Sequence, residues 1–82
     1  MNKLADLYEE HADDIIAIEQ LDTGKTYAQA SKLDFPGSAA TLRYYAGFAD
    51  KLEGNTSFNI PGVFGYTRKE AIGVCGQIIP WK

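Results

Sequence analysis

The chain has 82 residues, which is room for one small domain, and its 45% hydrophobic content excludes intrinsic disorder as the default state. The net charge of −3 and the scattered basic residues argue against a nucleic-acid-binding surface. No apolar run is long enough to span a bilayer, and the N-terminus lacks the features of a signal or transit peptide. We therefore expect an intracellular, cytoplasmic protein that binds no nucleic acid and no membrane. Its partner would be another protein or a small molecule.

The single cysteine, Cys75, excludes an internal disulfide, and no Cys/His group has the spacing of metal ligands. A monomer of this size buries only about 60–65% of its unfolded surface. We therefore expect marginal stability for the chain as a monomer and no metal site.

Residues 3–22 predict an amphipathic helix, because apolar side chains recur there at spacings of three and four. The predicted stripe consists of Leu4, Leu7, Tyr8, His11, Ile15, Ile18 and Leu21. Gly24 is placed to end this helix in a left-handed conformation. His11 lies at the edge of the stripe, and we interpret it as a half-buried packing residue rather than a catalytic one.

The Gly-Lys-Thr sequence at residues 24–26 superficially resembles a phosphate-binding loop. The first glycine of that motif would fall at position 19, which is Glu19, and no predicted strand precedes it. A helix C-cap followed by a new N-cap explains the same residues. Thr26 and Gln29 have capping-box spacing, which predicts a short second helix from about residue 27 to 32.

A third helix is predicted from Pro36, which suits a first helical turn, to about Glu53, with Gly54 closing it. Its apolar stripe consists of Ala39, Leu42, Tyr45, Ala46, Ala49 and Leu52. The helical part of the chain is therefore expected over residues 3–53.

Residues 56–69 predict a β-hairpin, because apolar and polar residues alternate on both sides of a Pro61-Gly62 turn. One face of this hairpin carries Phe58, Phe64 and Tyr66. A lone hairpin is barely stable in water, so we expect this face to pack on something else.

Residues 71–81 form an apolar run that suits a strand buried on both faces, as in a parallel sheet. Cys75 lies inside this run, where burial would close off access to its thiol. A small enzyme that uses Cys75, His11 and an acid such as Asp13 or Glu10 is an alternative, which nothing in the spacing favours. The expected fold is α+β, with three helices, a hairpin and a terminal strand in a single incomplete domain.

Three stretches together resemble the NAD(P)-dependent aldehyde dehydrogenase family. They are Leu4-Ala-Asp-Leu7 with Ile18-Glu-Gln-Leu-Asp-Thr-Gly-Lys25, then Thr41-Leu-Arg-Tyr-Tyr-Ala-Gly-Phe-Ala-Asp-Lys51, then Gly73-Val-Cys-Gly-Gln-Ile-Ile-Pro-Trp81. The resemblance covers essentially the whole chain but only an N-terminal portion of a much longer protein. It implies that the helices and the terminal strand are a partial piece of an α/β cofactor domain. The hairpin would be a bridging arm that makes oligomer contacts.

The resemblance also implies a site for NAD or NADP. The residues that match the family's cofactor contacts are Ile78, Ile79, Pro80 and Trp81, which would lie along the nicotinamide and its ribose. The family's nucleophilic cysteine and general-base glutamate lie far downstream, so no catalytic residue is expected here, and Cys75 matches an interior strand cysteine. Lys82 replaces the family's asparagine, whose amide helps to hold the oxyanion.

Two functions remain open, the first implied by the resemblance and the second suggested by the unpartnered apolar strand and the aromatic hairpin. The first is a fragment of an aldehyde dehydrogenase, which oxidises an aldehyde to a carboxylic acid and would be inactive in this short form. The alternative is a non-catalytic interaction fragment that docks on another copy or on a full-length homologue through the hairpin and the terminal strand.

Overall fold

The computed structural model describes residues 1–80; Trp81 and Lys82 lie outside the described residues. The chain divides into a helical unit, Met1–Lys51, and a second unit that begins at Leu52. The protein is thus a small helix-rich piece with a two-stranded sheet, as the α+β prediction requires of this chain. The prediction that it forms part of an α/β cofactor domain stays a prediction.

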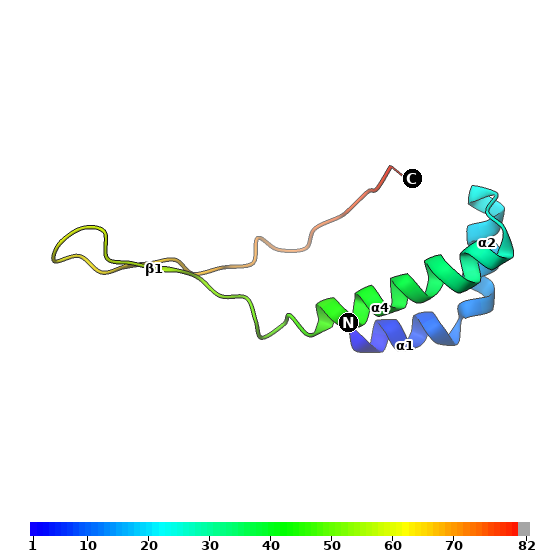
Figure 1. Ribbon diagram of the computed structural model, residues 1–82, viewed down its shortest axis with the longest axis horizontal. Helices are drawn as coiled ribbons and strands as arrows, with labels where there is room; N and C mark the ends of the chain where they lie inside the picture. The colour runs from blue at the N-terminus through cyan, green and yellow to red at the C-terminus, as the bar shows by residue number, and fades with distance from the viewer. Residues whose placement is uncertain (81–82) are drawn as a thin grey trace. The chain divides into compact units, whose positions relative to one another are not determined.

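The helical unit contains five helical segments in chain order (Figure 1). They are α1 (Asn2–Glu10), α2 (Ala12–Thr23), α3 (Tyr27–Gln29), the π-helical turn η1 (Ala30–Asp34) and α4 (Phe35–Ala46). No helix within residues 1–80 is long and apolar enough to cross a membrane.

The helix predicted over residues 3–22 is two helices that meet at His11. The backbone of His11 has φ −101° and ψ 27°, outside the α-helical region, so the prediction of one continuous helix is wrong. Leu7 O accepts hydrogen bonds from the His11 backbone N–H at 3.1 Å and from its ring Nδ1 at 2.9 Å. The His11 ring thereby adds a second hydrogen bond to a carbonyl in the last turn of α1.

The predicted caps between α2 and α3 are confirmed. Gly24 has φ 73° and ends α2 in the left-handed conformation, with its N–H bonded to Gln20 O at 2.9 Å. The Thr26 hydroxyl accepts the N–H of Gln29 at 3.3 Å and begins α3. This pair of caps gives the chain a sharp change of direction without a disordered loop.

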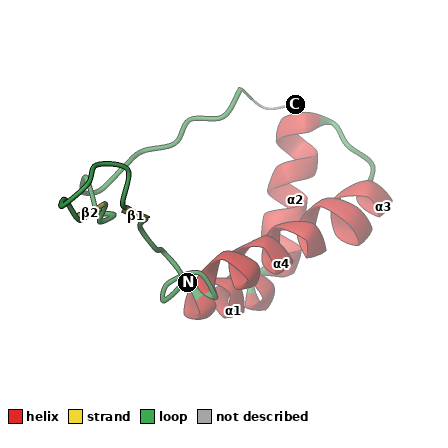
Figure 2. Ribbon diagram, turned by 60° about the vertical axis from the view of Figure 1, so that its left-hand side comes forward, coloured by secondary structure: helices red, strands yellow, loops and turns green. Residues whose placement is uncertain are grey.

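The second and third predicted helices run together, because α3, η1 and α4 follow one another without a break from residue 27 to 46 (Figure 2). The π-turn appears as the bond from Phe35 N–H to Ala30 O. Pro36 lies in the first turn of α4, as predicted, since its missing N–H costs nothing there.

Helix α4 ends at Ala46, so the predicted end near Glu53 and Gly54 is wrong. Gly47, a poor helix former, follows directly. Beyond it the chain tightens into i→i+3 bonds: Phe48 N–H donates to Tyr45 O at 3.1 Å and Ala49 N–H to Ala46 O at 3.4 Å. The glycine that stops this helix is therefore the one at position 47.

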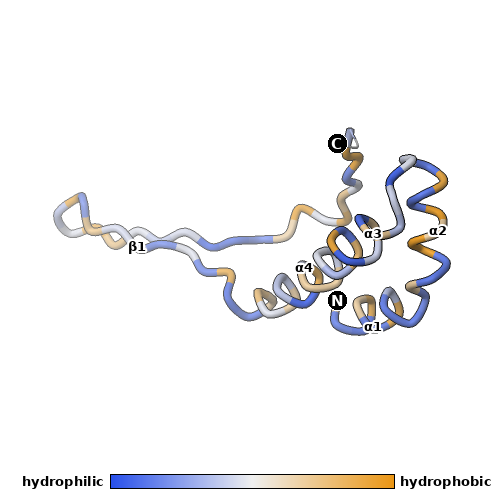
Figure 3. Tube along the Cα trace, turned by 45° about the vertical axis from the view of Figure 1, so that its right-hand side comes forward, coloured by the Kyte–Doolittle hydropathy of each residue, from blue (hydrophilic) through white to orange (hydrophobic). Residues whose placement is uncertain are grey.

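Alanines form most of the core of the helical unit. The buried residues are Ala5, Ile16, Ala30 and Ala39. Small side chains allow α1, η1 and α4 to approach closely. The apolar stripe predicted on residues 3–22 is largely exposed instead, with Ile18 66% and Leu21 88% exposed on α2. Figure 3 shows the hydrophobic stretches of α2 in orange. The unit has too few elements to cover a stripe of that width.

Two sets of side-chain contacts join α1 to the first and the last turn of α4. The rings of Tyr8 and Phe35 stack with centroids 4.4 Å apart and planes 8° apart. Arg43 pairs with Asp6 at 3.0 Å and also with Glu9, two acids on successive turns of α1. These hydrogen bonds, first that to Glu9 and then that to Asp6, raise the pKa of the Arg43 guanidinium.

The second unit contains the predicted hairpin. Strands β1 (Thr56–Ser57) and β2 (Gly65–Tyr66) pair antiparallel, with Thr56 opposite Tyr66. Between them Val63 N–H bonds to Ile60 O at 3.0 Å, and Gly62 has φ 78°, as a type II turn with Pro61 in second position requires. The turn is confirmed, although each paired strand has only two residues.

Residues 71–80 are assigned to no strand. Within the part of the chain that the structure describes, none of these residues takes part in a strand pair. Ile72 and Ile78 are each 99% exposed, so the expected burial of this run is absent here. A strand needs neighbours on its edges, and the terminal strand stays a prediction that depends on partners other than β1 and β2.

Candidate functional site

The candidate cofactor segment, residues 71–80, is the exposed apolar end of the second unit. Ile78 is 99% exposed, Ile79 is 59% exposed and Pro80 is also exposed, while Trp81 lies outside the described residues. Free backbone carbonyls and flat apolar side chains are what such a segment can offer to a planar ring and a sugar. These residues therefore fit contact with one part of a dinucleotide, but they do not form a complete pocket by themselves.

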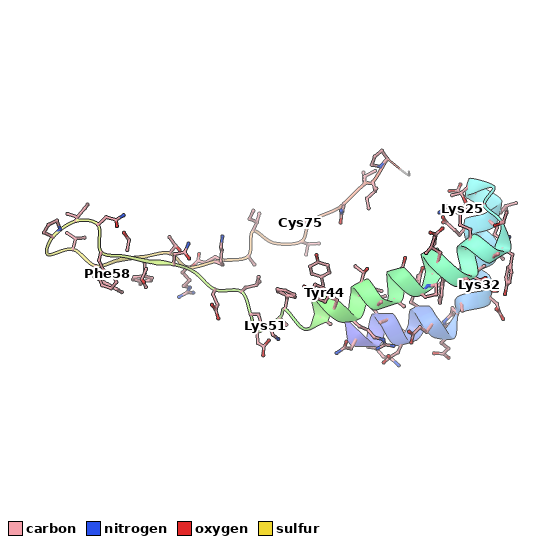
Figure 4. The ribbon with its side chains drawn as sticks, viewed as in Figure 1. Lys25, Lys32, Tyr44, Lys51, Phe58 and Cys75 are labelled. Carbon is pink, nitrogen blue, oxygen red and sulfur yellow. The ribbon has the colours of Figure 1, made fainter. Side chains whose placement is uncertain are left out.

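Cys75 lies on this same segment and is exposed (Figure 4). The expectation of a buried thiol is therefore wrong for this chain, because residues 71–80 are exposed to solvent and pair with no described strand. Its Sγ bonds only to Gly73 O, at 3.7 Å, among the described residues. A nucleophilic cysteine needs a base within hydrogen-bond reach, and the described part of the second unit places none beside Cys75.

The residues of the alternative small enzyme lie in different units: Cys75 in the second, His11 and Asp13 in the helical unit. His11 is exposed rather than half-buried, and its ring Nδ1 is committed to Leu7 O. Asp13 is in the first turn of α2, where its negative charge interacts favourably with the helix dipole and stabilises the helix. In residues 1–80, no group of three or more His, Cys, Asp or Glu side chains could hold a metal ion.

The Gly-Lys-Thr loop carries an ion-pair cluster that the sequence analysis missed. Lys25 Nζ lies 2.9 Å from Glu19 Oε1 and 2.8 Å from Asp34 Oδ2 (Figure 4). The hydrogen bond to Asp34, and then that to Glu19, raises the pKa of the Lys25 ammonium. A phosphate here would be repelled by the two carboxylates, so the Gly-Lys-Thr sequence does not form a phosphate-binding loop. The interpretation as a helix C-cap followed by an N-cap is confirmed.

The Asp34 carboxylate is the second acidic partner of Lys25 in this cluster. Its Oδ2 atom is buried, and the Lys25 ammonium 2.8 Å away supplies the charge that compensates it. The spacing of Glu19, Lys25 and Asp34 along the chain follows no helical or strand period. Only the fold of α2 back onto η1 brings the three together, so a periodic signal could not have found them.

The hairpin carries the predicted aromatic face. The ring centroids of Phe58 and Phe64 are 5.4 Å apart, and those of Phe64 and Tyr66 are 6.2 Å apart. The three side chains are 73%, 61% and 71% exposed in the order Phe58, Phe64 and Tyr66. An exposed cluster of aromatic rings is typical of a surface that contacts another protein.

Comparison with known proteins supplies the remaining evidence. The sequence pattern of the Aldehyde dehydrogenase family matches residues 1–82. An aldehyde dehydrogenase of Alternaria alternata is 57% identical over 81 residues, which are 99% of this chain and 16% of that protein. Over the same shares, "Aldehyde dehydrogenase, cytosolic 1" of Mus musculus is 48% identical and "Retinal dehydrogenase 2" of Gallus gallus is 49% identical.

No solved structure matches the chain. The chain spans about a sixth of the length of the curated relatives it matches. Its family is nevertheless fixed by a match that runs from end to end. The chain belongs to the aldehyde dehydrogenase family and corresponds to an N-terminal part of such a protein.

Proposed function

We propose that this chain supplies part of the nucleotide site for the NAD(P)-dependent oxidation of an aldehyde to a carboxylic acid. Ile78, Ile79, Pro80 and Trp81 would lie along the nicotinamide and its ribose. The observation that carries the proposal is the exposed apolar segment at residues 71–80, in a chain that the family pattern matches throughout. When bound, the nucleotide accepts the hydride from the substrate.

The residues of this chain would bind and orient the cofactor rather than react. Apolar cover from Ile78 and Ile79 would exclude water from one side of the nicotinamide, and their free carbonyls could accept hydrogen bonds from the ribose hydroxyls. The one contact of the Cys75 thiol within the described part of the second unit, Gly73 O, is not a base, which supports a non-catalytic Cys75. We therefore propose that the 82-residue chain alone does not turn over aldehyde. The cytosolic relative's name supports a place in the cytosol for the complete protein.

A chimera tests this function. Residues 1–82 would replace the matching part of the Alternaria alternata relative, whose remainder supplies the downstream residues. We expect aldehyde-dependent formation of NAD(P)H by the chimera and none by the 82-residue chain. Turnover by the 82-residue chain alone would contradict the proposed division of roles. A folded chimera that binds no nucleotide would contradict the proposed site.

A second candidate function is protein docking, which the exposed rings of Phe58, Phe64 and Tyr66 favour. In this case the chain would bind a second copy or a full-length homologue through the hairpin. Sedimentation of the chain with and without the Alternaria alternata relative would measure such a complex. We expect Phe64→Ser to weaken it and Leu21→Ser, at an exposed position on α2, to leave it unchanged. A monomeric chain that sediments independently of the relative would rule this function out.

A further inference from the structure

The base of the hairpin contains an irregular pair, Asn55 and Thr67, directly next to β1 and β2. Thr67 N–H donates to Asn55 O at 2.7 Å. Asn55 N–H donates to the side-chain Oγ1 of Thr67 at 2.8 Å. In a regular hydrogen-bonded antiparallel pair, this second bond would go to the Thr67 carbonyl. The hydroxyl of Thr67 therefore takes the place of the carbonyl of the same residue.

The carbonyl that is released in this way lies against Gly54. A Cβ atom added to Gly54 would lie 1.7 Å from Thr67 O and 2.7 Å from Thr67 C, distances that no side chain tolerates. Gly54 is therefore required for a close approach of backbone to backbone. Any other residue at position 54 would displace the Thr67 carbonyl.

This arrangement coincides with the end of the ladder. Thr56 and Tyr66 form the last regular pair before it, and the two legs of the hairpin run side by side at β1 and β2 and separate beyond them (Figure 1). If the register of that pair continued, residue 70 would lie opposite residue 52 and residue 71 opposite residue 51. The start of the candidate cofactor segment would then stay paired to the first leg.

We propose that Thr67 and Gly54 form a clasp that ends the hairpin ladder and directs the following chain away from the first leg. The Thr67 hydroxyl closes the last pair, while the turned carbonyl prevents the next one from forming. Residues 71–80 are thereby left free to pair with strands of another sheet. The role of those residues at a cofactor rests on the function proposed above, whereas the clasp itself rests on the contacts of Gly54, Asn55 and Thr67.

Hydrogen exchange of the Asn55 amide in the 82-residue chain, followed by NMR, tests the clasp. Thr67→Val removes the hydroxyl but keeps the shape and the strand preference of the side chain. We expect the Asn55 amide to exchange about fivefold faster in this variant, as the loss of one hydrogen bond implies. Thr67→Ser keeps the hydroxyl and should restore the exchange rate of the original chain.

Gly54→Ala tests the close approach separately. We expect it to abolish the cross-hairpin nuclear Overhauser contact between residues 54 and 67. Gly37→Ala is the matched control, because a Cβ added there meets nothing within 4 Å and should leave the hairpin spectrum unchanged. Circular dichroism of each variant checks that the helical unit is intact.

Three results would overturn the clasp. They are an unprotected Asn55 amide in the original chain, unchanged protection in Thr67→Val, and a retained contact between residues 54 and 67 in Gly54→Ala. Failure of the chimera to bind NAD(P) would contradict the proposed function and leave these hairpin measurements as they stand. The two proposals can therefore fail independently.

Discussion

Ile16 is the one large apolar side chain among the buried residues of the helical unit, and its truncation should remove a large part of that unit's stability. It lies on α2 and is 6% exposed, while the other buried residues are alanines. Ile16→Ala removes apolar carbons worth about 0.8 kcal/mol each and leaves a cavity, so we expect a loss of about 3 kcal/mol. A unit of this size is stable by about 3–8 kcal/mol at most.

The control is the same substitution two residues further on. Ile18 is 66% exposed on the same helix. Ile18→Ala therefore changes helix propensity by the same amount but removes little buried apolar surface. We expect its effect to stay within about 0.5 kcal/mol. Urea unfolding followed by far-UV circular dichroism would give both values. Equal midpoints for Ile16→Ala and Ile18→Ala would refute the assignment of the core.

The remaining predictions concern charge, the turn and the last residue. The pKa of Lys25 is raised above its ordinary value of 10.5, first by Asp34 and then by Glu19, so the stability it contributes is full below pH 10.5 and is lost as the pH rises through the higher folded-state value. The melting temperature should therefore fall more steeply above pH 10.5 in the original chain than in Lys25→Met, and equal slopes would contradict this. Gly62→Ala places a side chain at φ 78° at a cost of about 1 kcal/mol, so NMR should show the equilibrium constant for the Thr56–Tyr66 pair lowered about fivefold in this variant. Gly62→Asn, which tolerates that conformation, should keep the pair, and an unchanged pair in Gly62→Ala would refute the turn assignment. Lys82→Asn in the chimera should raise kcat by about 10²-fold or more if the amide donor is restored, and an unchanged kcat would show that the donor is not needed.

The local chemistry of the chain could be predicted from sequence because it depends on neighbours along the chain. The Gly24 cap, the Thr26 cap and the Pro61-Gly62 turn each follow from the conformational preference of one or two residues, and each is present. The end of α4 differs from the prediction. The apolar stripe continues past Ala46 to Leu52, but Gly47 weakens the helix and α4 ends before it.

Burial could not be predicted in the same way. The stripe from Leu4 to Leu21 was expected to form the core, but Ala5 and Ile16 are buried instead. A periodic pattern identifies an apolar face and does not say whether a partner covers it. The exposure of Cys75 and Ile78 has the same origin, because residues 71–80 pair with no strand in the described part of the chain. The candidate cofactor residues came from resemblance alone, and the structure adds only that Ile78, Ile79 and Pro80 are accessible.

The most direct test of the proposed nucleotide contact is the Michaelis constant of the chimera for NAD(P)⁺ after truncation of Trp81. We predict that Trp81→Ala raises this KM about tenfold or more, because the variant removes flat apolar cover from the cofactor. The matched change on the hairpin, Phe58→Ala, should leave the KM for NAD(P)⁺ unchanged. An unchanged KM in Trp81→Ala, or an equal rise in both variants, would contradict the claim that residues 78–81 contact the nucleotide.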